Sequence, residues 1–240
     1  MSERYITVDG VRYELTFEDE FEGDALDTAK WERCPEQMRQ DIGGWWRDRM
    51  SEVRDGKLIL WADIDADGTP ISGGIRTAGR FEQAMGYFEC RMKMHAATGF
   101  WGAFWMMCGE VFREDGSGES GVEIDIIESG ERARGGVNHA LHWDGYGAAH
   151  KSAVKVIRDE SQYDGGWHTY ALRWTAEAYI FYIDGKETWR TAEPGICKLP
   201  GYLKLTTEFG HWAAPLVREA LPDCVEVEYV RVYREAEDCL

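Results

Sequence analysis

The run Gly121–Ser129 combines three carboxylates with a change in alternation. In a strand, successive side chains point to opposite faces, so Glu123 and Asp125 share one face and the isoleucines between them share the other. A regular strand would place Glu128 with the isoleucines. One extra residue at Ile126–Ile127, a β-bulge, would return Glu128 to the carboxylate face, and such bulges are common beside active sites. The run therefore predicts a bulged strand with three acids on one face.

Two glutamates on such a strand suit one particular chemistry. Glu123 and Glu128 would be four strand steps apart, roughly 13 Å between Cα atoms at about 3.3 Å per step. Side chains that lean toward each other would bring their carboxyl groups near the roughly 5–5.5 Å of a retaining glycosidase. One carboxylate then attacks the sugar, while the other, its pKa raised by nearby negative charge, protonates the leaving oxygen. Asp125 would orient Glu123.

Two other interpretations of the triplet stay open at this point. A solvated acidic strand whose isoleucines pack a core is common and needs no catalysis. A metal site is the second, but no histidine lies at ligand spacing within the triplet. Because three acids on one face are electrostatically costly, a functional use is favoured.

Short runs of strand character, separated by turn signals, fill the chain. Asp9-Gly10 and Asp184-Gly185 are two-residue hairpin signals between such runs. Roughly ten or more runs of this kind predict an all-β protein, a sandwich of two antiparallel sheets. Helical periodicity is nearly absent, and no repeat or linker divides the chain. We therefore expect one domain over residues 1–240, large enough for a buried core.

The charge of the chain limits its partners. A formal net charge of −17 argues against nucleic acid and anionic membranes, and it would repel a strongly sulfated polysaccharide. No run of about 18 apolar residues is present to span a membrane. The first five residues lack the apolar core of a signal peptide, so we expect a cytoplasmic chain, or a secreted one if a leader was removed. The six cysteines form no Cys-x-x-Cys pair, and we expect mostly reduced, structural thiols.

Eleven tryptophans are many for this length, because the size and N–H of the indole make full burial awkward. We expect some in the core and others in a cleft, stacked on sugar rings. Trp101 and Trp105 fall on one side of a predicted strand and are candidates for such a platform, although either could be core. Arg76 is a candidate to bind a sugar hydroxyl or to pair with an acid.

An ordered set of motifs makes the chain resemble glycoside hydrolase family 16. The family signature Glu-x-Asp-x-(x)-Glu is spelled here by Glu123, Asp125 and Glu128. An acidic triplet alone would be a weak pattern, but further segments match in the family's order and cover nearly the whole chain. These segments are Phe17–Phe21, Ser72–Thr77, Gly86–Lys93, Gly99–Trp105, Trp167–Tyr170, Tyr182–Gly185 and Tyr229–Tyr233.

The resemblance implies a β-jelly-roll sandwich with an open concave substrate cleft, and endo-acting, retaining hydrolysis of β-linked glycans. It implies Glu123 as the nucleophile, Glu128 as the acid/base and Asp125 as the helper between them. The extra residue in the signature is similar to that of laminarinases, agarases, porphyranases and carrageenases.

Three more candidates for substrate binding come from the same resemblance. His142 with Trp143 is similar to a cleft segment of the family, and His142 would contact sugar or Glu128 unless it is structural. Trp212 is similar to a residue of a loop at the end of the cleft. His139 and His142 lie at odd and even positions of one predicted strand, so they would face opposite sides.

Two positions depart from the family pattern. Gly102 stands where many laminarinase-type members carry proline. Glu228 stands where an aspartate often helps to bind a structural calcium ion, and the Gly56 carbonyl and the Glu228 carboxylate would be the candidate ligands. The chemistry requires no cofactor. The resemblance implies only this structural calcium as a bound ion.

Taken together, these features indicate a retaining endo-β-glycanase that acts on a polysaccharide as a monomer. The expected substrate is a β-1,3-glucan, and the runner-up is a β-linked galactan of the agarase or porphyranase type. A transglycosylase would share every catalytic residue. A non-catalytic carbohydrate-binding relative is disfavoured, because it would have no need of all three acids.

Overall fold

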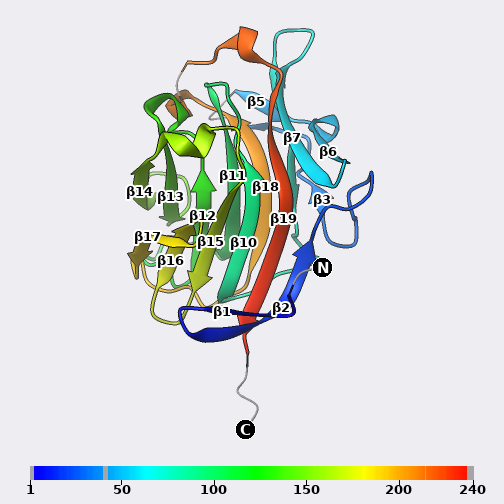
Figure 1. Cartoon of the computed structure of the whole chain (residues 1–240). Helices are drawn as coiled ribbons and strands as arrows, with labels where there is room; N and C mark the ends of the chain where they lie inside the picture. Colours follow the sequence, from blue (N-terminus) through cyan, green and yellow to red (C-terminus); the bar gives the residue numbers. More distant parts are fainter. Residues whose placement is uncertain (1–2, 40–42, 214, 237–240) are drawn as a thin grey trace.

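The computed structural model describes residues 3–39, 43–213 and 215–236. Its strands form two sheets that pack face to face (Figure 1). The helices of the described residues are short 3-10 turns: η1 (Asp48–Met50), η2 (Arg132–Arg134), η3 (Glu160–Tyr163), η4 (His211–Ala213) and η5 (Arg218–Ala220). The predicted all-β sandwich is therefore confirmed.

The larger sheet has 12 strands in the order β17-β16-β15-β10-β19-β7-β8-β5-β4, with β1, β2 and β6 attached beside this path. Its pairs are antiparallel except for β5 with β8, which is parallel. The strands are β1 (Tyr5–Val8), β2 (Val11–Asp19), β4 (Met38–Arg39), β5 (Gly44–Trp46), β6 (Ser51–Arg54), β7 (Lys57–Ile64), β8 (Pro70–Ser72), β10 (Gly86–Lys93), β15 (His168–Trp174), β16 (Tyr179–Ile183), β17 (Lys186–Thr191) and β19 (Asp223–Glu235).

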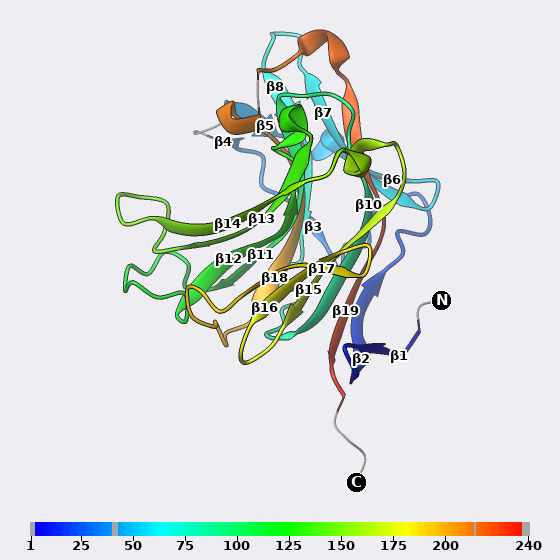
Figure 2. The same ribbon diagram turned by 60° about the vertical axis from the view of Figure 1, so that its left-hand side comes forward.

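The smaller sheet has seven strands in the order β14-β13-β12-β11-β18-β9-β3. These are β3 (Glu32–Arg33), β9 (Gly74–Arg76), β11 (Phe100–Gly109), β12 (Gly121–Glu128), β13 (Gly136–Trp143), β14 (Lys151–Arg158) and β18 (Gly201–Phe209). Figure 2 shows β14, β13, β12 and β11 in one layer and β10 with β19 in the other. The acidic strand β12 thus lies inside its sheet, between β11 and β13.

The main core lies between the two sheets and follows from strand alternation. Strand β12 contributes Val122, Ile124, Ile126 and Ile127, all fully buried. Strand β11 contributes Phe104, Met106 and Cys108 from every second position, as a strand with one buried face must. The glycine at position 102 also faces this core: a Cβ there would lie 2.4 Å from Val225 Cγ2, so no larger residue fits without movement.

The predicted bulge in β12 is present. Asp125 lies opposite Ala140 of β13, and Glu128 lies opposite Asn138. Between these two pairs β12 therefore contains one residue more than β13. On the other side, the pairing with β11 shifts at the same place, and Ile126 is the residue without a partner there. The bulge returns Glu128 to the face that carries Glu123 and Asp125. We call this outer face of the seven-stranded sheet the carboxylate face.

A buried histidine supports the bulge from the core side. His139 is fully buried, and its Nδ1–H donates to the Ile126 carbonyl at 2.6 Å. Since a carbonyl only accepts, Nε2 is the unprotonated nitrogen, and it accepts from the Thr188 hydroxyl of β17 at 2.8 Å. Burial lowers the pKa of His139 to about 4, which keeps the ring neutral. His139 thus connects the bulge to the opposite sheet.

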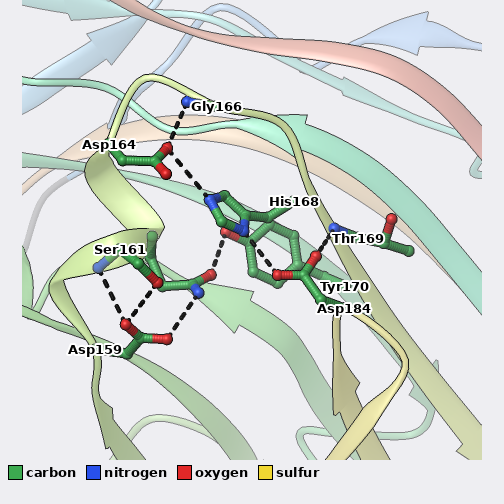
Figure 3. A network of polar contacts seen from close by, with 9 residues as sticks. Asp159, Ser161, Asp164, Gly166, His168, Thr169, Tyr170 and Asp184 are labelled. Atoms are coloured by element: carbon green, nitrogen blue, oxygen red, sulfur yellow. Dashed lines mark hydrogen bonds and ion pairs between the residues drawn. The ribbon is translucent and has the colours of Figure 1, made fainter.

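A second polar network ties η3 to β15 and β16 at one corner of the sandwich (Figure 3). His168 Nδ1 lies 2.8 Å from Asp184 Oδ2, and Nε2 lies 3.6 Å from Asp164 Oδ1. Burial disfavours the charged ring, but the hydrogen bond and the charges of the two aspartates outweigh it and raise the pKa of His168. The corner is therefore held by a histidine placed between two acids.

No disulfide joins the cysteines of the described residues, which are Cys34, Cys90, Cys108, Cys197 and Cys224. Four of them are buried, in agreement with the predicted structural role, and Cys239 lies outside the described residues. Among the described residues, no helix has the length and apolar character needed to cross a membrane.

Candidate active site

Strand β12 brings the three predicted acids together on the carboxylate face. Asp125 is 3% exposed, whereas Glu123 and Glu128 flank it with their side chains partly open to solvent. Across β11, Trp105 lies opposite Asp125 and Ala103 lies opposite Glu128. A buried acid between two accessible ones is the geometry expected of a helper residue between two reacting groups.

Glu128 lies in surroundings that favour its protonated form. Asn138 Nδ2 donates to its Oε2 at 2.8 Å, and the Trp101 indole also hydrogen-bonds to this carboxylate. Burial is the largest influence, and the charges of Glu123 and Glu208 add to it. Together they raise the pKa of Glu128 to about 8 although both hydrogen bonds act in the opposite direction. At neutral pH this carboxyl group holds a proton that it can donate.

Asp125 is perturbed in the same direction. Burial, followed by the negative charges of Glu128 and Glu123, raises its pKa well above the ordinary value, and the Lys204 ammonium partly opposes this. His142 Nε2 lies 3.4 Å from Asp125 Oδ2, outside good hydrogen-bond geometry. Burial and the nearby His150 lower the pKa of His142 to about 4, so the ring is neutral beside the acid.

Glu123 accepts a hydrogen bond from the hydroxyl group of Tyr146. Tyr146 follows β13 in a tight turn, and its ring is 47% exposed. The sequence places Tyr146 in a turn beside the predicted cleft, but it offers no signal that the side chain reaches back to Glu123 on the neighbouring strand. This residue was not among the predicted site residues.

Strand β18 adds a charged group that the sequence analysis missed. Tyr202, Lys204, Thr206 and Glu208 alternate along it and lie opposite Met107, Trp105, Ala103 and Trp101 of β11, which places them on the carboxylate face. Lys204 is 6% exposed and Glu208 is 3% exposed. The alternation is visible in the sequence, but only the pairing with β11 shows that this face is the one with the acids.

The predicted tryptophans divide between support and surface. Trp101 and Trp105 both lie on the carboxylate face, as predicted, but each is only 6% exposed. Trp105 Nε1 donates to Thr206 Oγ1 at 3.0 Å, so this indole is held against the carboxylate face. Trp212 is 37% exposed, and its ring lies 4.9 Å from that of Trp101. Beside Trp101, it is therefore the Trp212 ring that is exposed and available to stack on a sugar.

The other predicted substrate-binding residues, Trp143, His142 and Arg76, differ in how they lie relative to the three acids. Trp143 is 5% exposed and follows His142 on β13, so it lies on the opposite face of the strand from His142 and the acids. His142 does lie on the carboxylate face, but its acidic neighbours are Glu123, opposite it on β12, and Asp125, and not Glu128. Arg76, opposite Lys204, pairs with Glu32 at 2.6 Å.

Two groups of residues bear on metal binding. Glu123, Asp125 and His142 each offer a ligand atom, and these atoms lie within 4.8 Å of one another, so a histidine from the neighbouring strand supplies what the triplet itself lacks. The predicted calcium ligands fit less well. Glu228 is ion-paired with Arg91, and its strand neighbour Glu226 holds Lys57 at 2.6 Å and Lys93 at 3.0 Å.

Gly56 lies in the turn between β6 and β7, next to Lys57. A calcium ion needs several oxygen ligands, preferably with negative charge. Here the one carboxylate proposed for it already binds a guanidinium group, and two lysines lie nearby. The donor set at Gly56 and Glu228 does not fit calcium.

A pocket of about 560 Å³ lies elsewhere, between the loop after β11 and the ends of the other sheet. It is lined by Glu110, Arg113, Glu119, Ser120, Ala176, Ile196, Lys198 and Leu199. None of the predicted site residues lines it, so it has no part in the arrangement around β12.

The comparisons with known proteins agree with this geometry. Residues 38–229 match the model of the family described as "Glycosyl hydrolases family 16". This range contains the three acids, Tyr146 and the charged residues of β18. The chain belongs to glycosyl hydrolase family 16.

Individual relatives are distant. The chain is 26% identical over 260 residues to glucan endo-1,3-beta-glucosidase A1 of Niallia circulans, covering 92% of this chain and 38% of the relative. It is 27% identical over 252 residues to keratan-sulfate endo-1,4-beta-galactosidase of Sphingobacterium multivorum, covering 95% and 57%. The solved structure of the laminarinase from Rhodothermus marinus superposes with a TM-score of 0.79 at 25% identity, covering 94% of this chain and 98% of that one. The chain therefore spans less than two thirds of the length of these two curated relatives.

Proposed function

We propose that this chain is a retaining endo-β-glycanase in which Glu123 is the nucleophile and Glu128 the acid/base. The observation that carries the proposal is the bulge in β12. It places a carboxyl group with a pKa raised to about 8 on the same face as a second, hydrogen-bonded carboxylate. Double displacement requires two carboxyl groups on one face, one to attack as a carboxylate and one to donate a proton.

The reaction then runs in two steps. A Glu123 oxygen bonds to the anomeric carbon as the bond to the leaving oxygen breaks, and Glu128 gives that oxygen its proton. Water then attacks the same carbon, loses a proton to Glu128, and returns the electron pair to Glu123. Asp125, buried between them with a raised pKa, would hold a proton with which it can orient Glu123.

The proposed substrate is a β-1,3-glucan. Its support is the similarity to the glucan endo-1,3-beta-glucosidase of Niallia circulans and to the Rhodothermus marinus laminarinase. A β-linked galactan is the second candidate, because the similarity to a keratan-sulfate endo-1,4-beta-galactosidase extends over 95% of this chain.

The proposal treats the chain as a monomer that needs no metal for catalysis. Light scattering after size exclusion tests the first part, and activity in excess chelator tests the second. A transglycosylase would use the same acids, and it would release few new reducing ends relative to the bonds it cleaves.

A substitution series tests the assignment. Glu128→Gln should lower kcat by roughly 10²–10⁴-fold on a polysaccharide, because it removes the proton donor. Glu123→Gln should abolish turnover, because no covalent intermediate forms. The matched control is Glu187→Gln, which changes an exposed glutamate of β17 paired with Arg190.

The assay is digestion of laminarin, lichenan, agarose, porphyran and galactan with sizing of the products. Endo-cleavage of laminarin by the wild type and the control, but by neither active-site variant, supports the proposal. Near-normal turnover by both active-site variants, with folded protein shown by circular dichroism, would contradict it.

A further inference from the structure

The hydroxyl group of Tyr146 is hydrogen-bonded to Glu123, the nucleophile of the proposed reaction, and nothing in the sequence assigns Tyr146 a role. We propose that Tyr146 is a positioning residue for Glu123, whose hydroxyl group assists the release of the covalent glycosyl intermediate. The inference rests on the proposed function, because it requires Glu123 to form that intermediate.

The backbone around Tyr146 is held from two sides. The two residues before it, Asp144 and Gly145, have φ values of 60° and 70°, a left-handed pair that turns the chain sharply after β13. Asp144 is 2% exposed, and its carboxylate accepts from the Gly116 N–H at 2.9 Å and from Lys151 at 2.8 Å. The Gly145 N–H donates to the Val111 carbonyl at 2.8 Å.

These contacts join the turn after β13 to the loop after β11, and both project from the same end of the strands of the seven-stranded sheet (Figure 2). A hydroxyl group carried by so constrained a turn keeps its direction without a large loss of entropy on substrate binding. The position of Tyr146 over β12 is therefore built into the fold.

The ring of Tyr146 is packed as well. Phe112 meets it edge-on with ring centres 5.5 Å apart, and the His150 ring lies at 5.9 Å. Met107 Sδ, on the strand beside β12, lies 3.6 Å from the hydroxyl oxygen. With its ring fixed in this way, the hydroxyl group donates to Glu123 Oε2. Because almost half of the ring is exposed, a sugar bound at Glu123 would meet it.

The chemistry follows from when Glu123 carries its charge. During attack the carboxylate loses charge to the new bond, so a hydrogen bond to it weakens and gives no help. During release the bond between the anomeric carbon and Glu123 breaks, and its electron pair returns to the carboxylate while water adds to the carbon. The Tyr146 hydrogen bond then strengthens, because hydrogen bonds to charged groups are the stronger ones. Tyr146 should therefore speed the second step more than the first.

The test uses Tyr146→Phe, which keeps the ring and removes only the hydroxyl group. The substrate is a 2,4-dinitrophenyl β-glycoside of laminaribiose, or of the galactan disaccharide if the polysaccharide panel selects a galactan. Its good leaving group makes release of the intermediate rate-limiting. We expect kcat to fall roughly ten- to hundredfold, the range for one hydrogen bond to a charged group, and KM to fall with it. A pre-steady-state burst of dinitrophenol, equal to the enzyme concentration, should accompany the change.

Two further variants separate this role from packing. Tyr182→Phe removes a comparable bond, from a tyrosine hydroxyl to Asp9 Oδ2 at 2.5 Å, in the other sheet, and it should leave kcat and KM unchanged. Phe112→Ala removes the ring contact and keeps the hydroxyl group, so we expect a raised KM without a fall in kcat.

Unchanged kcat and KM in Tyr146→Phe, with Glu123→Gln inactive, would overturn the role of Tyr146 and leave the proposed function standing. An equal effect of Phe112→Ala and Tyr146→Phe on kcat would also overturn it, because packing alone would then explain the loss. Activity in Glu123→Gln would overturn both proposals together.

Discussion

The ammonium nitrogen of Lys204 lies 3.5 Å from the centre of the Trp105 ring. A second indole, that of Trp46, lies 4.9 Å from the same nitrogen, so the cation sits against two aromatic faces. Lysines are almost never this buried unless their charge is compensated. Here the compensation comes from acids on the same face, since Lys204 acts on Asp125 and Glu208 lies four residues along its own strand. The layer of side chains beneath the three acids of β12 thus carries charges of both signs.

Replacing Lys204 by methionine should therefore change both stability and titration. We expect the free energy of unfolding to fall by about 2 kcal/mol, the scale of a desolvated cation–π contact. The loss of positive charge should also raise the pKa of Asp125 further, and it should extend the basic limb of the kcat/KM profile to higher pH, because Asp125 acts in its protonated form. Lys204→Arg should restore most of the profile, and the exposed Lys186→Met is the control. A profile identical to wild type in Lys204→Met would show that its charge does not act on the acids.

Glu208 should act in the opposite direction. Its charge raises the pKa of Glu128, which must be protonated to act as the acid, so activity should be lost as the pH rises above about 8. Glu208→Gln keeps an acceptor for the Thr206 hydroxyl, which lies 3.2 Å from Oε1, and removes the charge. We expect the basic limb of kcat/KM to shift to lower pH. A shift to higher pH, or none, would contradict the proposed influence of Glu208.

The bulge should depend on His139. His139→Leu leaves the buried Ile126 carbonyl without its donor, which costs about 1–3 kcal/mol of unfolding free energy. Because Glu128 follows the bulge by two residues, kcat should fall more than KM changes. Thr188→Val keeps the Ile126 contact. It removes the second hydrogen bond of the His139 ring and the contact of the Thr188 hydroxyl with the Phe181 carbonyl at 3.1 Å, and it should have the smaller effect on both quantities. Urea unfolding and steady-state kinetics measure the two effects, and equal losses in the two variants would argue against a special role for the Ile126 contact.

The corner in Figure 3 predicts a pH-dependent stability. The pKa of His168 is raised in the folded protein, so its contribution is fully present below the unfolded value of about 6.5 and is lost as the pH rises through the folded value. The difference in unfolding free energy between wild type and His168→Gln should therefore be larger at pH 6 than at pH 9. A difference that does not change between these two pH values would contradict a charged role for His168.

Local patterns in the sequence were sufficient for most of the fold. Alternation and turn signals predict the two-sheet sandwich, and the slipped alternation before Glu128 predicts the bulge, because each depends on residues adjacent in the chain. Alternation also separates two of the predicted site residues. His142 and Trp143 are neighbours on one strand and cannot both face the acids, so only one of them could belong to the site.

Contacts between distant segments could not be predicted in this way. The hydroxyl of Tyr146 reaches Glu123 from 23 residues away, through a turn whose direction depends on its contacts with the loop after β11. Lys204 meets Trp105 only because β18 pairs with β11 in one particular register. A shift of one residue would have turned Lys204 toward the core. Register and loop contacts are tertiary properties, and a single sequence carries no direct signal of them.

The central claim is double displacement by Glu123 and Glu128, and the stereochemistry of the first product tests it most directly. Proton NMR of the polysaccharide digest in its first minutes, with enough enzyme to outrun mutarotation, reads the anomeric configuration of the new reducing ends. We expect the β anomer to form first and the α anomer to follow as mutarotation proceeds. Initial release of the α anomer would mean inversion, and it would contradict the assignment of Glu123 as the nucleophile.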